Sequence, residues 1–248
     1  MTARLDAEML RRGLCKSRNR AQTLIDEGHV TVNGLVCMKA SRKISETDSV
    51  AVTEQLPFVG RGGYKLRYAL AEFRIRLDGL CCLDIGASTG GFTDCMLQNG
   101  AKSVLAVDVG HDQIAEVLRS DPRVTVLEGT DIRTLPPDTR GLPADFVSCD
   151  VSFISLKQII PSLPSLMTDN GSAVLLVKPQ FEAGRSALNK HGIVRDEKIR
   201  QQVLRDVRDC AAQNGLIPEA ECESPIKGGS GNTEYLLFLH KCQESRLS

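Results

Sequence analysis

The spacing of apolar residues predicts two helices at the start of the chain. Apolar side chains recur at helical spacing over residues 3–12 and again over 18–27. Ser17 is placed to cap the second helix, because its hydroxyl can accept from a backbone N–H of the first turn, and Gly28 is placed to end it. The chain is therefore expected to begin with a pair of short helices.

The period then changes from helical to alternating. Apolar and polar residues alternate over 30–37, interrupted by Asn33 and Gly34, a dipeptide that strongly favours a two-residue hairpin turn. A further strand is expected over 49–52. Together these elements predict a small α+β domain over residues 1–55.

Strand and helix signals alternate through the remainder of the chain. Pro57 disfavours helix on its N-terminal side, which indicates a linker over 56–60 and a second domain over 61–248. Apolar runs predict strands at 80–85, 103–108, 124–127, 144–151, 172–178, 219–223 and 234–240. A long helix is expected over 196–214. This order predicts an α/β domain with a parallel sheet covered on both faces, whose ligands bind beyond the carboxyl ends of the strands.

The charges are distributed unevenly between the two parts. The chain carries 31 Lys and Arg against 31 Asp and Glu, but residues 1–76 hold 14 of the basic and only 8 of the acidic residues. A basic N-terminal part predicts a polyanionic partner, because Lys and Arg displace counterions from phosphates. The basic residues expected to contact RNA are Arg4, Arg11, Arg12, Lys16, Arg18, Arg20, Lys39 and Arg61.

Composition narrows the classes of protein further. Hydrophobic residues make up 42% and charged residues 25%, as in folded globular proteins. No run of about 18 apolar residues predicts a membrane span, and the charged first residues do not resemble a secretory signal, so we expect a cytoplasmic protein. The 9 cysteines form no Cys-x-x-Cys pair and no Cys/His cluster, which argues against a metal site.

The most specific motif lies where the first strand of the second domain meets the following helix. Segment 83–93 places Asp84 at the strand end, followed by glycines with the spacing Gly-x-x-x-Gly-Gly. Dinucleotide-binding turns have Gly-x-Gly-x-x-Gly instead. The segment resembles motif I of Rossmann-like methyltransferases, in which the acidic residue lies beside the cationic amino acid part of S-adenosylmethionine. The resemblance implies cofactor contacts from Asp84, Gly86, Ala87, Ser88, Gly90, Gly91, Phe92 and Thr93.

Acidic residues also follow the next three strands. Asp108 ends the second strand, where a carboxylate can accept both ribose hydroxyls of a nucleoside cofactor. Asp131 follows the third strand, where the methyltransferase fold normally meets the adenine amine, and Asp150 lies where cofactor and acceptor meet. Each could be an ordinary loop aspartate, but acidic residues after four successive strands favour a cofactor site.

Four charged residues resemble the Lys-Asp-Lys-Glu set of ribose 2'-O-methyltransferases. They are Lys65, Asp150, Lys178 and Glu234. Lys178 ends an apolar strand, and buried lysines are usually paired. The resemblance implies that Lys178 orients or deprotonates the ribose hydroxyl and that Lys65 stabilises the developing alkoxide charge. The two carboxylates would orient the lysines.

The N-terminal domain resembles the S4-type RNA-binding domain, named after a small-subunit ribosomal protein. The resemblance is carried by Arg4-Leu5-Asp6, Gly13-Leu14, Ser17-Arg18, Ala21 and residues 28–34. The alternative is a small domain that docks on a protein rather than on RNA.

Over nearly its whole length the chain resembles the TlyA-like family of ribosomal RNA 2'-O-methyltransferases, also called haemolysin A. Further motifs of this resemblance lie at 61–66, 178–182, 191–196 and 224–228. The resemblance implies transfer of a methyl group from S-adenosylmethionine to a cytidine ribose of ribosomal RNA or ribosomal subunits. The alternatives are another RNA-modifying enzyme such as a pseudouridine synthase, an RNA-binding protein of other activity, and a haemolysin-like protein.

Overall fold

The structure is a computed structural model that describes all residues except 1, 28, 38, 53–57, 230 and 243–248. The chain divides into two compact units, Met1–Arg61 and Gly62–Ser248. Phe58 is buried and its carbonyl oxygen accepts a hydrogen bond from Arg20, so packing within the first unit continues past residue 55. Residues 56 and 57 of the predicted linker lie outside the described residues, and the predicted domain limits stay predictions.

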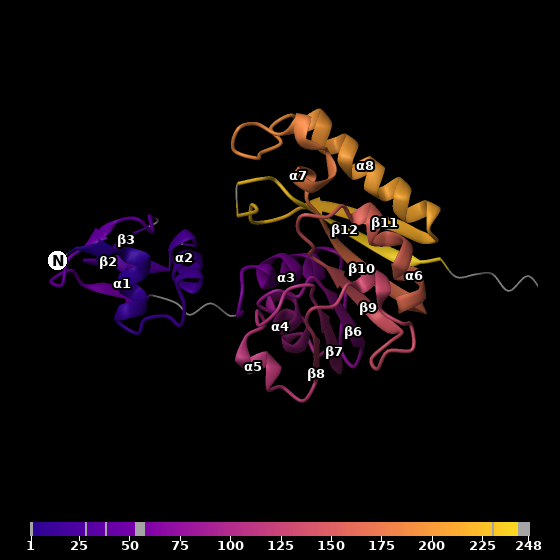
Figure 1. The fold of residues 1–248 in the computed structure, drawn as a ribbon, viewed down its shortest axis with the longest axis horizontal. Helices are drawn as coiled ribbons and strands as arrows, with labels where there is room; N and C mark the ends of the chain where they lie inside the picture. Colours follow the sequence, from indigo (N-terminus) through magenta and orange to yellow (C-terminus); the bar gives the residue numbers. More distant parts are fainter. Residues whose placement is uncertain (1, 28, 38, 53–57, 230, 243–248) are drawn as a thin grey trace, which may run out of the picture. The chain divides into compact units, whose positions relative to one another are not determined.

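The first unit combines two helices with short strands (Figure 1). The helices are α1 (Leu5–Arg11) and α2 (Arg18–Asp26), and the strands are β1 (Ala3–Arg4), β2 (Val30–Val32), β3 (Leu35–Val36), β4 (Lys43–Ile44) and β5 (Val50–Val52). Strand β2 pairs antiparallel with β3 and β5, and β1 pairs antiparallel with β4. Buried side chains of both helices and of β2 form the core, among them Leu5, Met9, Leu24, Ile25 and Val30.

The local signals in the sequence predicted most of this unit. The Ser17 side chain caps α2 by accepting from the backbone N–H of Arg20 at 3.1 Å. The hairpin turns at Asn33 and Gly34, which have φ values of 54° and 79° as the predicted turn requires. The first helix starts later than predicted, because residues 3 and 4 are extended and pair with β4. Gly28, predicted to end the second helix, lies outside the described residues.

Within the described residues, the second unit is built around a seven-stranded sheet with the order β11-β12-β10-β9-β6-β7-β8. Its strands are β6 (Cys81–Ile85), β7 (Ser103–Val107), β8 (Val124–Leu127), β9 (Ala144–Cys149), β10 (Met167–Val177), β11 (Leu216–Glu223) and β12 (Tyr235–Lys241). Its α-helices are α3 (Gly62–Glu72), α4 (Gly91–Gln98), α5 (Glu116–Arg119), α6 (Leu163–Leu166), α7 (Pro179–Glu182) and α8 (Glu197–Gln213). Single 3-10 turns lie at η1 (Ile132–Thr134), η2 (Leu156–Gln158), η3 (Ile160–Ser162) and η4 (Arg185–Ala187).

The sheet is mostly parallel, as predicted, but it contains one antiparallel strand that the sequence did not indicate. Strands β10, β9, β6, β7 and β8 pair in parallel, but β12 runs antiparallel to both of its neighbours, β10 and β11. Parallel neighbours need a long crossover connection, usually a helix. The connection from β11 to β12, residues 224–234, contains no helix among its described residues, and the chain returns beside β11 in the opposite direction.

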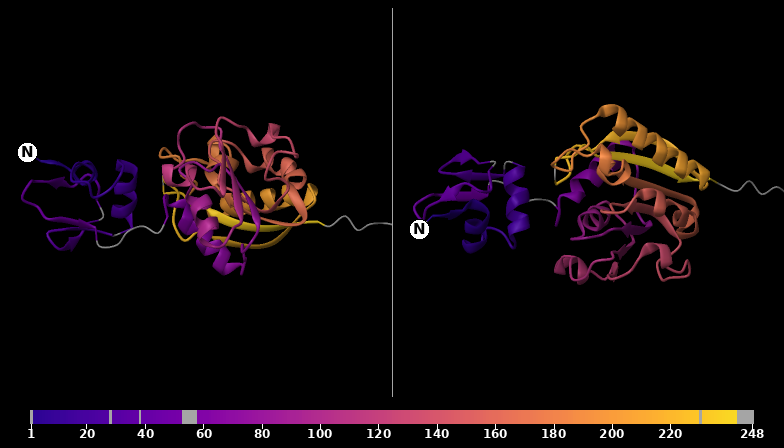
Figure 2. Two further views of the ribbon diagram at one scale, coloured as in Figure 1. Left: turned by 90° about the horizontal axis from the view of Figure 1, so that it is seen from below. Right: turned by 45° about the horizontal axis from the view of Figure 1, so that its top comes forward.

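Helices cover both faces of the sheet (Figure 2). On one face, α8 shares an apolar core with alternate residues of the central strands, such as Leu83 and Val147. On the other face, α4 contacts β6 and β7, and α3 packs against α4. The intervening strand residues Asp84 and Ser148 point towards α4. The described helices are all too short or too polar to span a membrane.

Candidate active site

A pocket opens at the carboxyl edge shared by β6, β9 and β10. The turn after β6, the residues after β9 and β10, and the first turn of α3 form its wall. Its lining residues are Gly62, Gly86, Ala87, Ser88, Thr89, Gly91, Phe92, Asp150, Ser152 and Lys178. Most of these were predicted from motif I and the charged set, but Gly62, Thr89 and Ser152 were missed. Thr89 lies within the motif I segment 83–93 and Gly62 within the motif at 61–66, and Ser152 follows Asp150 by two residues, so their place in the sequence could have indicated them.

The glycine turn after β6 packs tightly against the end of β9. Gly86 has a φ of 79°, and a Cβ atom there would lie 2.5 Å from the carbonyl oxygen of Asp150. The sequence suggested that the glycines make room for a ligand. At Gly86 the backbone of β9 by itself leaves no space for a side chain. Gly90, with a φ of 93°, is enclosed by Leu118 and is not among the lining residues.

Asp84 lies inside the unit and does not line the pocket. Its side chain is 0% exposed, with Oδ2 accepting from Thr93 Oγ1 at 2.6 Å and Oδ1 accepting from Ser148 Oγ at 2.9 Å. Burial raises the pKa of Asp84 to about 6, an effect that the two hydroxyl groups only partly offset. Asp84 therefore joins β6, β9 and α4, and its predicted contact with the cofactor stays a prediction.

Asp108 and Asp131 are both engaged in local hydrogen bonds. Asp108 accepts from the backbone N–H groups of Ser88 and Gly110, each at 2.7 Å, and so ties the glycine turn to the loop after β7. Asp131 accepts from the backbone N–H of Arg133 at 3.0 Å, and its ion pair with the Arg133 guanidinium measures 2.6 Å. These bonds lower the pKa of Asp131. The contacts of Asp108 with the ribose and of Asp131 with the adenine of the cofactor stay predictions.

Lys178 and Asp150 form an ion pair in the pocket wall. Lys178 Nζ lies 2.6 Å from Asp150 Oδ1 and donates to Ser152 Oγ at 2.8 Å. The lysine is 8% exposed, because β10 delivers it from the sheet interior. Two oxygen partners hold the ammonium group at the edge of the pocket.

Lys65 and Glu234 form a second, more deeply buried ion pair. Lys65 comes from α3, and its Nζ donates to Glu234 Oε2 at 2.5 Å. The residues are 7% and 2% exposed, and burial strengthens such a pair electrostatically while raising its desolvation cost. Gln180 Nε2 donates to Glu234 Oε1 at 3.4 Å.

The predicted set of four is therefore arranged as two lysine–carboxylate pairs. Two short segments connect them. Gly62, in the pocket wall, lies one helical turn before Lys65 in α3, and Gln180, which contacts Glu234, follows Lys178 by two residues. The sequence-based hypothesis had the two carboxylates orient the lysines without saying which carboxylate meets which lysine, and the structure supplies this pairing. Their roles in catalysis stay predictions.

The segments after β9 and β10 are joined by Glu182, which the sequence did not single out as a site residue. Its carboxylate accepts from Ser155 Oγ at 2.5 Å and from the backbone N–H of Leu156 at 2.7 Å. In the same region Phe153 is 91% exposed, has a φ of 65°, and lies against Phe181 with ring centroids 5.1 Å apart. Sequence spacing cannot show which side chains of two separate loops meet.

The arginines predicted to bind RNA are held by acidic or carbonyl groups of the first unit. Arg4 and Arg18 pair with buried Asp6 at 3.0 and 2.8 Å. Arg20 donates to the carbonyl of Phe58, and Arg61 lies 3.6 Å from Asp26 in an ion pair. The two predicted lysines, Lys16 and Lys39, are exposed.

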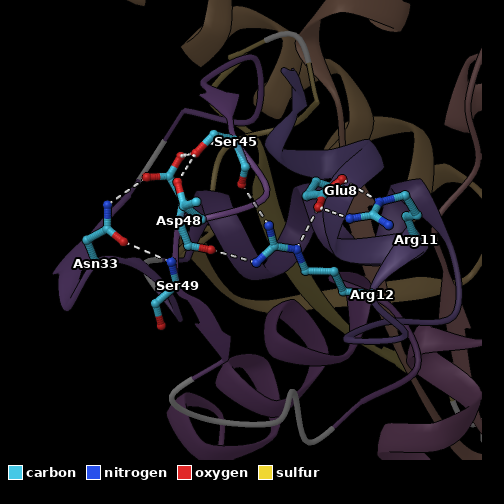
Figure 3. Close-up of polar contacts among 8 residues, drawn as sticks. Glu8, Arg11, Arg12, Asn33, Ser45, Asp48 and Ser49 are labelled. Carbon is cyan, nitrogen blue, oxygen red and sulfur yellow. Dashed lines mark hydrogen bonds and ion pairs between the residues drawn. The ribbon is translucent and has the colours of Figure 1, made fainter. Parts of the chain in front are cut away.

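Arg11 and Arg12 share the buried carboxylate of Glu8 (Figure 3). Arg11 approaches Glu8 through two nitrogens, at 2.8 and 2.6 Å, and its side chain is 61% exposed. Arg12 also donates to the carbonyls of Asp48 and Ser45, at 2.7 and 2.9 Å, and is 21% exposed. Arg12 therefore acts as a bridge inside the unit, and its RNA contact stays a prediction.

In the described residues, no group of three or more His, Cys, Asp or Glu side chains is placed to hold a metal ion.

The fold and the pocket define the class of protein. The protein is a Rossmann-like S-adenosylmethionine-dependent methyltransferase. Its sheet has β12 as the antiparallel strand, a glycine turn follows β6, and carboxylates lie beyond β7 and β9. The chain belongs to the FtsJ-like methyltransferase family, whose model matches residues 58–241. The S4 domain model matches residues 3–50.

Similar proteins extend over nearly the full chain. The 16S/23S rRNA (cytidine-2'-O)-methyltransferase TlyA of Mycobacterium tuberculosis is 42% identical over 248 residues, which are 99% of this chain and 92% of that protein. Hemolysin A of Brachyspira hyodysenteriae is 41% identical over 235 residues, 94% of this chain and 98% of that protein. A solved structure of a candidate hemolysin from Streptococcus thermophilus is 43% identical, with a TM-score of 0.77 and coverage of 97% and 89%.

Proposed function

We propose that the protein transfers a methyl group from S-adenosylmethionine to the ribose 2'-oxygen of a cytidine in ribosomal RNA, in the cytoplasm. The observation that carries the proposal is the Lys178–Asp150 pair in the wall of the pocket formed by motif I. The FtsJ-like family and the activity named for the Mycobacterium tuberculosis relative agree with it.

The residues present fit S-adenosylmethionine. The turn that lines the pocket offers backbone groups without bulky side chains at Gly86 and Gly91. Asp108 and Asp150 place carboxylates beside this turn, where a cationic amino acid or a ribose hydroxyl can bind. When bound, the cofactor supplies the methyl group.

Lys178 would act on the ribose hydroxyl. A 2'-hydroxyl is a weak nucleophile, so the enzyme must hold its oxygen in line with the methyl group and favour loss of its proton. The Lys178 ammonium, fixed by Asp150 and Ser152, can donate to that oxygen and stabilise its negative charge while the hydroxyl proton passes to water. Lys65, fixed by Glu234, adds a second positive charge on the α3 side.

The first unit would bind the RNA. It matches the S4 domain model and carries exposed arginines and lysines, groups that bind phosphates. Of the predicted RNA-binding residues, Arg4, Arg11, Lys16, Arg18 and Lys39 are exposed and so are accessible to a phosphate.

Methyl transfer to ribosomal subunits tests the proposal. Small and large subunits that lack the modification would be incubated separately with labelled cofactor and the modified nucleotide mapped. We expect label on a cytidine ribose and none on a substrate with a 2'-deoxy substitution at that nucleotide, since the acceptor oxygen is then absent. Methylation of the deoxy substrate would mean that the target is a base. Absence of labelling in both subunits would favour an RNA-binding protein of other activity.

Replacement of Lys178 tests the role of the first pair. Lys178→Ala should lower the rate of methyl transfer by about 100-fold or more, as expected for loss of a positioned proton-transfer or charge-stabilising group. Cofactor affinity, measured by calorimetry, should stay within about threefold. Lys198→Ala, on the exposed surface of α8, is the matched control and should keep the parental rate. Full activity of Lys178→Ala would show that Lys178 has only a structural role at the end of β10.

A further inference from the structure

A buried carboxylate joins two exposed arginines in the first unit. Asp6 is 4% exposed, whereas the side chains of Arg4 and Arg18 are 44% and 56% exposed. Arg4 ends β1, Asp6 lies in the first turn of α1, and Arg18 begins α2. One buried group thus fixes two surface cations that come from different elements.

The two oxygens of Asp6 have separate sets of donors. Oδ1 accepts from Arg4 Nε and from the backbone N–H of Ala7, both at 3.0 Å. Oδ2 accepts from Arg4 Nη2 at 3.2 Å and from Arg18 Nη2 at 2.8 Å. Burial favours a higher pKa for Asp6, but the hydrogen bonds from the two arginines outweigh it and lower the pKa to about 2. The carboxylate therefore stays ionised at neutral pH.

This arrangement suits the binding of phosphates. A long side chain loses conformational freedom when it binds, and a guanidinium that is already held in place loses less. A guanidinium has five N–H donors, so Arg18, which meets Asp6 through Nη2, has further donors for a phosphate. Two guanidiniums and one carboxylate also leave the group with a net positive charge.

We propose that Asp6 is a positioning residue that presents Arg4 and Arg18 as a preformed pair to the phosphate backbone of RNA. The inference rests on the proposed function, in which the first unit binds ribosomal RNA. Glu8 makes a different arrangement, because its partner Arg12 is also bound to the carbonyls of Ser45 and Asp48 and serves the scaffold.

Asp6→Asn separates positioning from simple charge. Asn keeps an oxygen for Ala7 and places an NH₂ group where Oδ2 accepts from both arginines. Removal of a negative charge would by itself tighten RNA binding. Loss of positioning should instead weaken the binding of the full chain to transcribed 16S and 23S RNA by about tenfold, the order expected when one or two long side chains must be ordered.

Glu46→Gln is the matched control. Glu46 is exposed and lies close enough to Arg11 to affect it electrostatically, so the variant makes the same charge change in the same unit. Its RNA affinity should equal or slightly exceed that of the parent. Asp6→Glu retains the charge, so its RNA affinity should lie between those of Asp6→Asn and the parent. If Asp6→Asn does not fold, Asp6→Glu is tested in its place.

A background without the arginines distinguishes positioning from damage to the fold. In Arg4→Ala/Arg18→Ala, a further Asp6→Asn change should cause no additional loss of RNA affinity, whereas general unfolding would weaken both backgrounds. If Asp6→Asn binds RNA as tightly as the parent or more tightly, while Arg18→Ala binds more weakly, the positioning role of Asp6 is overturned. The RNA contact of the arginines would then still stand. If the double arginine variant binds RNA as the parent does, the proposed RNA contact fails and the positioning role fails with it.

Discussion

The carboxylate of Asp84 is enclosed by hydroxyl groups rather than by cations. Thr93 and Ser148 donate to its two oxygens at full burial, so the charge is stabilised by hydrogen bonds but not by an opposite charge. Burial raises its pKa from 3.8 to about 6. The ionised form of Asp84 therefore lowers the stability of the unit, in contrast to Asp6, whose arginines lower its pKa.

Asp84→Asn should change how stability depends on pH. Because the folded pKa lies above the unfolded one, the contribution of Asp84 is fully present below about pH 4 and is lost as the pH rises through about 6. The parent should lose roughly 2 kcal/mol of unfolding free energy from this group between pH 4.5 and 7.5, at about 1.4 kcal/mol per pKa unit. Asp84→Asn should not show this loss.

Urea unfolding of both proteins at pH 4.5 and 7.5, followed by circular dichroism, measures the difference. The change between the two pH values in Asp84→Asn reports all other titrating groups, so the additional change in the parent is the contribution of Asp84. Identical changes in the parent and in Asp84→Asn would show that the carboxyl group has an ordinary pKa in the folded protein.

Elements of the first unit are connected by a chain of polar contacts (Figure 3). Glu8 of α1 binds Arg12, and Arg12 reaches the carbonyl of Asp48. The Asp48 side chain accepts from Asn33 Nδ2 at 2.8 Å, and Asn33 Oδ1 accepts from the backbone N–H of Ser49 at 2.8 Å. These contacts connect helix α1, the β2–β3 turn and the segment before β5 across the surface of the core.

Arg12 and Arg11 form a matched pair for testing this network, since both bind Glu8. Arg12→Ala should lower the Tm of the first unit by about 5 °C or more, because it leaves Glu8 with fewer donors and removes the donor shared by two carbonyls. Arg11→Ala should shift the Tm by less than about 2 °C, since its side chain is mostly exposed. Thermal unfolding of both variants is the measurement, and equal shifts would contradict a bridging role for Arg12.

At the scale of the molecule, the residues of the proposed reaction and those of the proposed RNA contact belong to different compact units. The pocket, both lysine–carboxylate pairs and the apolar core around β6 and β9 all lie in the second unit, from Gly62 onward. The basic residues held by Asp6 and Glu8 lie before Arg61 and pack on a separate core. Cofactor binding and RNA anchoring are therefore expected to be separable.

A fragment of residues 62–248 tests this separation. Its affinity for S-adenosylmethionine, measured by calorimetry, should stay within about twofold of the parental value, which also shows that the fragment is folded. Its affinity for ribosomal RNA should fall by at least about tenfold, and the dependence of that affinity on salt should become weaker as phosphate contacts are lost. Methylation of ribosomal subunits by the fragment at the parental rate would count against the first unit as an RNA anchor.

The sequence by itself determined the elements and the position of the pocket. Hydrophobic period, caps and turn residues are local signals, so the Asn33-Gly34 hairpin, helix α8 and most strands of the second unit were predicted to within a few residues. Strand β10 is the exception, because it begins at Met167, five residues before the predicted start. The glycine spacing after β6 and the acidic strand ends were enough to place a methyltransferase site at the carboxyl edge of the sheet.

Only the tertiary structure decided which distant groups meet. Lys65 and Glu234 are 169 positions apart, and their pairing depends on the order of β12 and β10 in the sheet. The antiparallel direction of β12, the enclosure of Asp84 by two hydroxyl groups and the capture of Arg4 and Arg18 by Asp6 likewise result from packing between elements. Local periodicity does not encode such contacts, because it fixes the face on which a side chain lies but not the partner that covers that face.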